Sequence, residues 1–570
     1  MDKRWTIKKH DYEAVKSFSE NLKVSPLVAA LLISRGHNTK ESAHKFLNPQ
    51  HSDLHEPFLL KGMKEAVGRI LKAIEDNEKI LIWGDYDVDG TTGTVLLRKT
   101  LQILDAETGF HIPNRFTEGY GINIPALEKY KAEGFTLAIS VDCGIRSFEP
   151  LEWARDNGLD VIVTDHHLSD DVRENPPAVA VVNPNQPGCS YPDKNLAGVG
   201  VAFKLAHALL REKGRQHLVN SFLKIAAIGT VADVMQLTGE NRAIVSLGLK
   251  DLSITKNVGL KALMEVADCR SDMTSYHIGF RIAPRINAAG RMDVARNVVE
   301  LFECIDFNEA RKLAGILDSR NRERQQIQQQ ITDLAFFDAE NLGSQKFVVV
   351  AGENWHRGVI GLAASKIAER LHRPTIVLSI ENGFAHGSAR SIENYHLLNA
   401  LESCPELFEQ FGGHAAAAGM KIKVENIESL REKLNFHAGG TLLDDQLIPE
   451  LKIDALVKPQ TIDLRLLEEL RCFEPFGAGN PKPIFVTRDL FLRDEPFVMK
   501  HKHLKMRVSD NAGRHFEAVW WDGVEKSRGR TLSAESRIEL AYTLEANTWQ
   551  GNTRLQLVVE DLRADNQTGD

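Results

Sequence analysis

The sequence predicts a multidomain α/β protein in which two sheet-and-helix domains precede a small β-barrel. Its 570 residues exceed what one hydrophobic core normally holds together. Between Lys79 and about Val245, short β-rich runs alternate with segments of helical length, which is typical of a parallel sheet with helices on both faces. After residue 448 the pattern changes to closely spaced short strands, which favours a barrel.

The N-terminal region, residues 1–75, has helical and amphipathic periodicity. We expect it to form a helical lead-in that packs on the first domain. The N-terminus has no apolar stretch of the kind that opens a secretory signal, and no apolar run reaches the ~18 residues that a membrane span requires. Six cysteines without a CxxC pair are typical of reduced thiols. We therefore expect a cytoplasmic protein without membrane contact.

Residues 76–245 are predicted to form the first α/β domain. Strands are expected at 80–83, 109–112, 136–141, 160–163 and 178–182, and helices at 91–104, 124–132 and 148–157. Right-handed crossovers between such strands place all their carboxyl ends at one edge of the sheet, where ligands bind.

The rest of the chain is predicted to hold three further parts. Residues 246–340 read as a helical connector that ends in a long helix. A smaller α/β domain follows at 341–440 and contains an unusual glycine- and alanine-rich element at 411–419. The alternating strands of residues 448–562 predict an OB-like β-barrel.

Acidic and imidazole side chains follow the strands of the first domain where each strand ends. They are Asp85, Asp87 and Asp89 after 80–83, Asp142 after 136–141, Asp165, His166 and His167 after 160–163, and Asp233 further along. Any single one of them is more often a turn or cap residue. Together, at one sheet edge, they favour a site for a pair of divalent cations.

The residue types also limit which cations and which motif are involved. A nitrogen ligand such as His166 shifts the preference from Mg²⁺ towards Mn²⁺ without excluding Mg²⁺. In a turn the two histidines can diverge, so one can bind metal and the other a phosphate oxygen. A P-loop is excluded because the turn reads Asp-Gly-Thr-Thr, without the required lysine.

These ordered motifs resemble the DHH phosphoesterase superfamily. The likeness covers nearly the whole chain: a DHH domain, a connector helix, a DHHA1 domain with a Gly-Gly-His element, and a C-terminal OB domain. It implies a 5′→3′ exonuclease that hydrolyses single-stranded DNA with a free 5′ end to 5′-mononucleotides, in DNA repair and recombination. It also implies Mn²⁺ or Mg²⁺, with two ions per site.

The resemblance assigns roles to the strand-end residues by position. The expected metal ligands are Asp85, Asp87, Asp89, Asp142, His166 and Asp233. Asp142 would bridge the two ions, and His167 would contact the scissile phosphate. The pyrophosphatase branch of the superfamily has a ligand histidine where this chain has Trp83, and we expect Asp85 to compensate.

A second set of residues is expected to bind nucleic acid or phosphate. In the second domain a hydroxyl, a guanidinium and exposed backbone amides are suited to phosphate, and the resemblance places them across a cleft from the first site: Ser388, Arg390, Gly412, Gly413 and His414. Further candidates are Asn114, Arg115, Arg281, Arg285, Asn287 and Arg291, for which capping and ion pairing are the alternative. In the barrel, Trp520, Trp521 and Trp549 lie near a basic run and form either a stacking platform or the barrel core.

Two other functions are compatible with the motifs. One is a DHH phosphodiesterase that acts on short oligoribonucleotides or cyclic dinucleotides, and the added barrel argues against it. The other is a non-catalytic single-strand-binding DHH scaffold, and the intact acids argue against it. The net charge of −8 does not exclude DNA, because a local basic groove can bind it. The resemblance further implies a single-strand-binding protein and a helicase as partners, and we expect a monomer.

Overall fold

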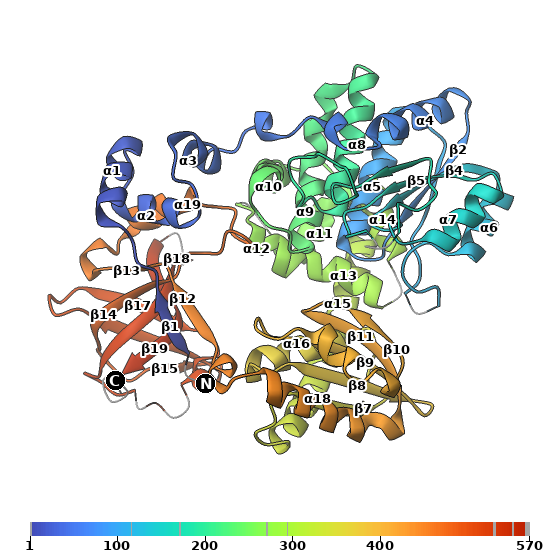
Figure 1. Cartoon of the computed structure of the whole chain (residues 1–570). Coiled ribbons are helices and arrows are strands. Elements are labelled where there is room, and N and C mark those ends of the chain that lie inside the picture. The colour runs from blue at the N-terminus through green and yellow to red at the C-terminus, as the bar shows by residue number, and fades with distance from the viewer. Residues whose placement is uncertain are drawn as a thin grey trace. The chain divides into compact units, whose positions relative to one another are not determined.

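The computed structural model describes residues 3–115, 117–169, 173–269, 272–292, 295–527, 530, 532–549 and 552–564. The chain divides into two compact units, whose helices and strands are labelled in Figure 1. The central unit consists of His44–Gln326 together with Phe473–Pro481. The terminal unit consists of Met1–Ala43, Ile327–Cys472 and Lys482–Asp570.

The central unit is built on a five-stranded parallel sheet with the strand order β3-β2-β4-β5-β6. The strands are β2 (Lys79–Gly84), β3 (Thr108–His111), β4 (Phe135–Val141), β5 (Asp160–Thr164) and β6 (Ala180–Val182). This confirms the parallel-sheet fold that the alternating pattern predicts.

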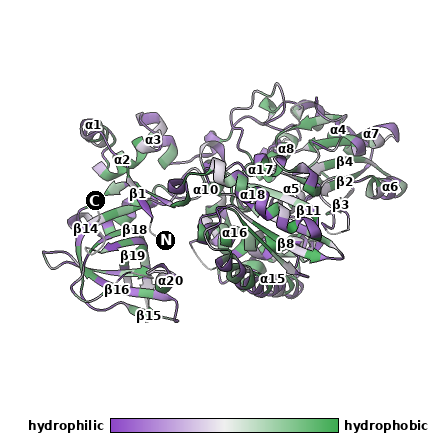
Figure 2. Cartoon of the chain, turned by 60° about the horizontal axis from the view of Figure 1, so that its bottom comes forward, coloured by the Kyte–Doolittle hydropathy of each residue, from purple (hydrophilic) through white to green (hydrophobic). Residues whose placement is uncertain are grey.

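Helices cover both faces of this sheet, because alternate strand residues point to opposite sides. Ile80 and Ile82 pack in one cluster with α4 (Met63–Glu75), α5 (Val88–Ile103) and α8 (Gly198–Glu212). Leu81 and Trp83 pack in another with α6 (Ile124–Ala132) and α7 (Phe148–Asp156). Figure 2 shows hydrophobic residues along the strands and mixed faces on the helices.

The remainder of the central unit is helical, as expected for the region after residue 246. Its helices are η3 (Gln216–Phe222), α9 (Leu223–Ala232), α10 (Gly239–Ser253), α11 (Val258–Val266), α12 (Ser275–His277), the π-helix η4 (Ile278–Ile282), α13 (Ala283–Arg291) and α14 (Arg296–Glu303). The long helix α15 (Phe307–Asn341) follows.

The terminal unit contains a second sheet with the order β10-β11-β9-β8-β7, in which only β7 and β8 are parallel. Its strands are β7 (Val348–Glu353), β8 (Thr375–Glu381), β9 (Phe384–Arg390), β10 (Phe408–Gly413) and β11 (Ala417–Lys423). The helices are α16 (Ile360–Leu371), α17 (Leu397–Glu402) and α18 (Ile427–Thr441).

The expected β-barrel is also present in the terminal unit. Its strand order is β13-β14-β18-β19-β17-β16-β15, and a further pairing of β14 with β16 curls the sheet. The strands are β13 (Ala455–Leu456), β14 (Phe485–Leu492), β15 (Phe497–Met499), β16 (His503–Ser509), β17 (His515–Trp520), β18 (Arg537–Trp549) and β19 (Asn552–Ala564), with helices α19 (Leu464–Arg471) and α20 (Gly523–Lys526).

The expectation of a helical lead-in on the first domain is wrong for residues 1–43, whereas residues 44–75 group with the central unit and contain α4. Strand β1 (Arg4–Ile7) pairs in parallel with β12 (Glu450–Ile453), and residues 1–43 group with the terminal unit. A four-residue strand is too short for its period-two pattern to be told from the helical pattern around it. The helices that follow are α1 (Tyr12–Leu22), α2 (Pro26–Ser34) and α3 (Lys40–Leu47).

Among the described residues, no helix combines the length and the apolar character needed to cross a bilayer.

The buried carboxylate of Asp561 links β1 to the barrel and provides a test of this arrangement. The Arg530 guanidinium lies 2.9 Å from Asp561, and both side chains are about 5% exposed or less. Trp5 Nε1 donates to the other Asp561 oxygen at 2.8 Å. We expect Asp561→Ala to lower the free energy of unfolding by about 3–5 kcal/mol, because it removes a buried carboxylate that the Arg530 guanidinium and the Trp5 indole share. Urea unfolding of the full chain measures this.

The control for that substitution is Asp494→Ala, which removes the partner of Arg507 in an exposed pair of the same barrel. We expect it to cost about 1 kcal/mol or less. Equal small losses in the two variants would contradict the role given to Asp561.

Candidate metal centre

The candidate site lies at the carboxyl edge of the central sheet. Asp85 directly follows β2, Asp142 follows β4, and Asp165 follows β5. Because the strands are parallel, their ends meet at one edge, and the three acids lie close together as the sequence predicts. Asp142 has a positive φ of 63°, so the chain turns sharply there as it leaves the sheet.

The turn between β2 and α5 presents two acids from a helix N-terminus. Asp87 is the N-cap of α5, and its carboxylate accepts from the Gly90 amide at 3.0 Å. The helix begins at Val88, earlier than the expected start at about residue 91, so Asp89 lies in its first turn. Gly90 is required because a Cβ there would lie 2.5–2.7 Å from the backbone of Asp85.

Asp89 caps a neighbouring helix. Its carboxylate accepts from the amides of Gly198 at 2.6 Å and Val199 at 2.7 Å, at the start of α8. Glycine at position 198 also lets Asp142 approach the start of α8, because a Cβ there would lie 2.6 Å from the Cβ of Asp142. Asp89 is therefore held by two amides at the positive end of α8, which favours a carboxylate.

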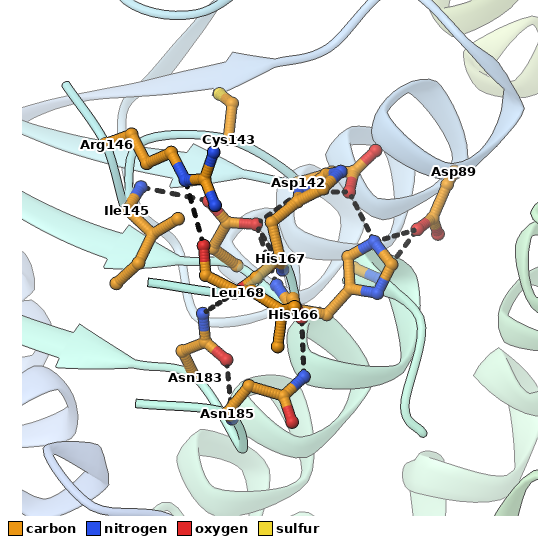
Figure 3. Close-up of polar contacts among 12 residues, drawn as sticks. Asp89, Asp142, Cys143, Ile145, Arg146, His166, His167, Leu168, Asn183 and Asn185 are labelled. Atoms are coloured by element: carbon orange, nitrogen blue, oxygen red, sulfur yellow. Dashed lines mark hydrogen bonds and ion pairs between the residues drawn. The ribbon is translucent and has the colours of Figure 1, made fainter. Parts of the chain in front are cut away.

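Asp165 is not among the predicted ligands or catalytic residues, yet it holds the two histidines. One of its oxygens accepts from the amides of His166 at 2.7 Å and His167 at 3.1 Å and contacts His167 Nδ1 at 2.8 Å. Asn183 and Asn185 donate to the carbonyls of His167 and His166 (Figure 3). The signal in the sequence is the position of Asp165 directly after a buried strand.

The ligand atoms converge around the imidazole of His166. Its Nε2 lies 3.2 Å from Asp142, 3.6 Å from Asp233 and 3.8 Å from Asp89, and Figure 3 shows the ring pointing towards Asp89 and Asp142. Neighbouring ligands of one Mg²⁺ with ~2.1 Å bonds are about 3 Å apart. The spacing therefore suits a cation between these side chains.

Two sets of residues fit separate cation positions. In each, one ligand atom per residue lies within 4.8 Å of the others, and the sets are Asp89, His166 and Asp233, and Asp85, Asp87 and Asp142. A third such set joins Asp142 to His166 and His167, so Asp142 connects the two positions. All the predicted metal ligands are brought together here.

The carboxylates are destabilised by burial and by one another. Burial, with the nearby Asp87 charge, raises the pKa of Asp85 to about 8 and that of Asp233 to about 7. Burial and neighbouring acids raise the pKa of Asp89 and Asp142 well above the ordinary range. One oxygen each of Asp85 and Asp142 is buried without a hydrogen-bond partner among the described residues. Bound cations would compensate these charges.

The two histidines are held in different protonation states. Burial, helped by the charge of His167, lowers the pKa of His166 to about 4, so its imidazole is neutral and suited to a metal. Burial would also lower the pKa of His167, but the hydrogen bond and charge of Asp165 outweigh it and raise that pKa to about 9. His167 is therefore a cation at neutral pH.

Aromatic side chains that the sequence motifs do not single out line this site. Tyr120 donates from its hydroxyl to the Asp142 carbonyl at 3.2 Å and lies edge-on to His167 and Tyr86. The predicted residue Arg115 lies over the Tyr86 ring, 4.7 Å from its centroid. The only signal for Tyr120 is its place between two glycines, both of which have positive φ.

The other polar candidates of the central unit have structural contacts. The Asn287 side chain accepts from the Val88 amide at 3.3 Å, and that of Asn114 accepts from the Thr117 amide at 3.2 Å. Arg291 lies near enough to lower the pKa of Asp87. The contacts of Asn287 and Arg291 place these two side chains beside the turn that carries Asp87, whereas the contact of Asn114 is within its own loop.

Arg281 and Arg285 are engaged on the protein itself. Arg285 donates to Asp318 at 3.0 Å and to the Arg281 carbonyl at 2.6 Å, and Arg281 donates to the Asp268 carbonyl at 2.6 Å. These contacts correspond to the capping and pairing alternative. A DNA contact by either arginine stays a prediction.

The phosphate candidates of the terminal unit form one patch on adjacent strands. Gly419 pairs with Ser388 on β9 and with Gly412 on β10, and Arg390 donates to the Ser388 hydroxyl at 3.1 Å. A Cβ at Gly412 or Gly419 would meet nothing within 4 Å, so packing in the described structure does not require these glycines. Gly413, at the end of β10, and the exposed His414 that follows it extend this patch, and we refer to Gly412, Gly413 and Gly419 as the glycine strip.

Comparison with known proteins identifies family models along most of the chain. They are the N-terminal domain of the DHH family at residues 79–230, the DHHA1 domain at 344–436, and the RecJ OB domain at 453–561. The order of the three matches is the one that the sequence pattern predicts.

Full-length relatives and solved structures are similar over almost the whole chain. The single-stranded-DNA-specific exonuclease RecJ of Bacillus subtilis is 42% identical over 98% of this chain and 70% of its own length. The single-stranded-DNA-specific exonuclease RecJ of Thermus thermophilus is 32% identical over 95% of this chain and 76% of its own length. The crystal structure of RecJ in complex with Mn²⁺ from Thermus thermophilus matches with a TM-score of 0.84 and 29% identity, covering 98% of this chain and 79% of that one.

Because the buried acids of the site repel one another to different extents, we expect Asp85→Asn and Asp165→Asn to change the Tm in opposite directions. Because the folded pKa of Asp85 is about 8 rather than the ordinary 3.8, the metal-free fold loses stability as the pH rises between these values. We expect Asp85→Asn to raise the Tm of metal-free protein at about pH 8, with little gain at about pH 4. Thermal melts in chelator measure this.

Asp165→Asn is the matched control. Its carboxylate is fully hydrogen-bonded, its pKa is lowered despite burial, and its contribution to stability is lost only as the pH falls. We expect Asp165→Asn to lower the Tm at about pH 8. A rise in both variants would contradict the difference between the two acids.

Proposed function

Because the chain belongs to the RecJ family of single-stranded-DNA-specific exonucleases, we propose that it hydrolyses single-stranded DNA from a free 5′ end to 5′-mononucleotides, with Mn²⁺ or Mg²⁺. The observation that carries this proposal is the convergence of the His166 imidazole with three carboxylates at the carboxyl edge of the sheet. We place the activity in DNA repair and recombination in the cytoplasm, in a monomer that works with a single-strand-binding protein and a helicase.

The residues divide between two cation positions. Asp89, His166 and Asp233 would hold one ion, Asp85 and Asp87 the other, and Asp142 would bridge them, in keeping with the sets whose atoms converge. A pair of divalent cations held there would supply a nucleophile at neutral pH and would stabilise charge on the phosphate oxygens. Neutral His166 is ready to coordinate without first losing a proton.

His167 is suited to the phosphate rather than to the metal. Its Nδ1 is engaged with Asp165, which leaves Nε2–H as the donor to a phosphate oxygen, and its raised pKa keeps the ring charged. A fixed cation beside the scissile phosphate stabilises the negative charge that develops there during cleavage. Arg115, beside Tyr86, adds a second positive charge at the same edge.

The terminal unit offers surfaces for the rest of the strand. Arg390 and Ser388 form a forked clamp suited to a 5′-phosphate, and the glycine strip beside them allows a sugar-phosphate backbone to approach. On the barrel, Trp521 is 48% exposed whereas Trp520 is 1% exposed. Trp521 is therefore the stacking candidate and Trp520 belongs to the core; the Trp549 side chain lies outside the described residues.

The alternatives are less well supported. A phosphodiesterase that acts on cyclic dinucleotides or short oligoribonucleotides does not require an additional domain such as the barrel to bind its substrate. A non-catalytic scaffold has no need to keep five carboxylates and one imidazole together in a buried site at a cost in stability. The family relation therefore favours the exonuclease over both.

The decisive experiment is digestion of 5′- and 3′-labelled single and double strands with Mn²⁺ and with chelator. We expect release of the 5′ label first, from single strands only, and no cleavage in chelator. Asp142→Ala should lower turnover by at least about 1,000-fold, because it removes the carboxylate shared by both positions, while DNA binding persists. The exposed Asp156→Ala serves as control. Wild-type turnover in Asp142→Ala would refute the assignment.

The clamp on the terminal unit predicts a preference for phosphorylated ends. We expect Arg390→Ala to reduce cleavage of 5′-phosphorylated strands about 10-fold more than cleavage of 5′-hydroxyl strands, because only the former lose a charge-assisted contact. Initial rates on the two substrates measure it, with the exposed Arg465→Ala as control. Equal losses on both substrates would rule out a 5′-phosphate role.

A further inference from the structure

A short segment of the chain, Phe473–Pro481, belongs to the central unit although its neighbours in sequence do not. Residues up to Cys472 and from Lys482 onward group with the terminal unit. The segment also falls within the residues that match the RecJ OB model. It thus brings a part of the C-terminal sequence into the unit that holds the metal centre.

Arg242 of α10 holds the start of this segment by its backbone. The Arg242 side chain is buried, with 2% of the residue exposed, and its guanidinium donates to the carbonyls of Phe473 at 3.0 Å, Glu474 at 2.8 Å and Pro475 at 3.4 Å. Its Nε donates to the carbonyl of Phe46 at 2.7 Å, and the guanidinium lies 3.8 Å over the Phe46 ring. The planar group therefore fixes several carbonyls at once.

Asn480 closes the segment into a tight turn. It is fully buried, and its Nδ2 donates to the carbonyls of Phe473 at 2.7 Å and Pro475 at 2.8 Å. Gly477 and Asn480 also exchange two backbone hydrogen bonds, at 2.9 and 3.1 Å. We refer to residues 477–480 as the buttress turn.

The buttress turn packs against the loop that joins α9 to α10. The Ala478 carbonyl accepts from the Leu237 amide at 2.7 Å. A Cβ on Gly477 would lie 2.7 Å from Cδ1 of Leu237. Gly479 has φ +71°, and a Cβ there would lie 3.2 Å from Thr238. Glycine is thus needed at both positions for this approach.

The contacted loop begins at Asp233. Asp233 follows α9 directly and donates its amide to the Gly229 carbonyl at 2.9 Å, and Val234 after it has φ 57°. Among the described residues, no backbone amide donates to the Asp233 carboxylate, whereas amides hold those of Asp87 and Asp89. The direction of the Asp233 side chain therefore depends on the path of the loop that carries it.

We propose that the buttress turn, held by Arg242 and Asn480, is a positioning element for Asp233. It sets the affinity of the cation position formed by Asp89, His166 and Asp233. This inference rests on the proposed metal centre and adds to it a part of the C-terminal sequence as a determinant of metal binding.

The test measures Mn²⁺ binding by electron paramagnetic resonance on the full chain, independently of turnover. We expect Gly477→Ala to raise the Kd of one Mn²⁺ by about 10-fold, as for residues that orient a metal ligand, and to leave the other Mn²⁺ unchanged. Asp233→Ala should weaken the same ion. The double variant should be no weaker than Asp233→Ala alone, because both changes act through one carboxylate.

Gly68→Ala on α4 is the matched control, because a Cβ there meets nothing within 4 Å, and it should bind both ions as the wild type does. If circular dichroism shows that the Gly477→Ala variant does not fold, Ser275→Ala is used instead. That variant removes only a hydroxyl that donates to the Phe476 carbonyl at 2.5 Å, and it should show the same pattern with a smaller loss.

Three results would overturn the inference. One is unchanged affinity for both ions in a folded Gly477→Ala variant and in Ser275→Ala. Another is an additive loss in the double variant, which would mean that the turn acts on some other ligand. The third is a wild-type chain that binds no Mn²⁺, and that result would refute the proposed function itself and so is distinguishable from the first two.

Discussion

The structure of the central unit depends on bringing several carboxylates within about 4 Å of one imidazole in a mostly buried crevice. Such a cluster is unfavourable in itself, because each buried anion loses hydration and repels the others. The fold offsets part of this cost with the N-terminal ends of α5 and α8, which direct amides at Asp87 and Asp89. The remaining negative charge suits the crevice to doubly charged cations.

Chemically similar side chains acquire different roles from their surroundings. Asp165 is buried like Asp85, yet hydrogen bonds keep it ionised whereas Asp85 has an oxygen without a partner among the described residues. The adjacent histidines likewise differ, one neutral and one charged. Separation of this kind between neighbouring titratable groups would allow one site to bind a metal and a phosphate at the same pH, as in the function proposed above.

Much of this arrangement follows from the sequence, and the failures have physical causes. Acids that follow apolar runs are predicted to lie at one edge of the sheet, because the carboxyl ends of parallel strands meet there. Asp85, Asp142 and His166 lie at that edge. The predicted start of α5, at about residue 91, is three residues too late. Asp87 acts as the N-cap of the helix, and the neighbouring acids in the sequence conceal this role. Arg285 carries no local signal that its partner is Asp318 on another helix. Such pairings, like that of β1 with β12, are decided by tertiary contacts that periodicity does not record.

The pairing of β1 with β12 has a consequence for how the polypeptide is made. The strand at residues 4–7 is synthesised long before the strand that it joins, because 446 residues separate Lys8 from its partner Asp454 beside the pair. At 5–20 residues per second, synthesis of that interval takes roughly 20–90 seconds. For that time β1 has no strand to join, so its pairing with β12 can form only after residues 44–326 of the central unit have been synthesised.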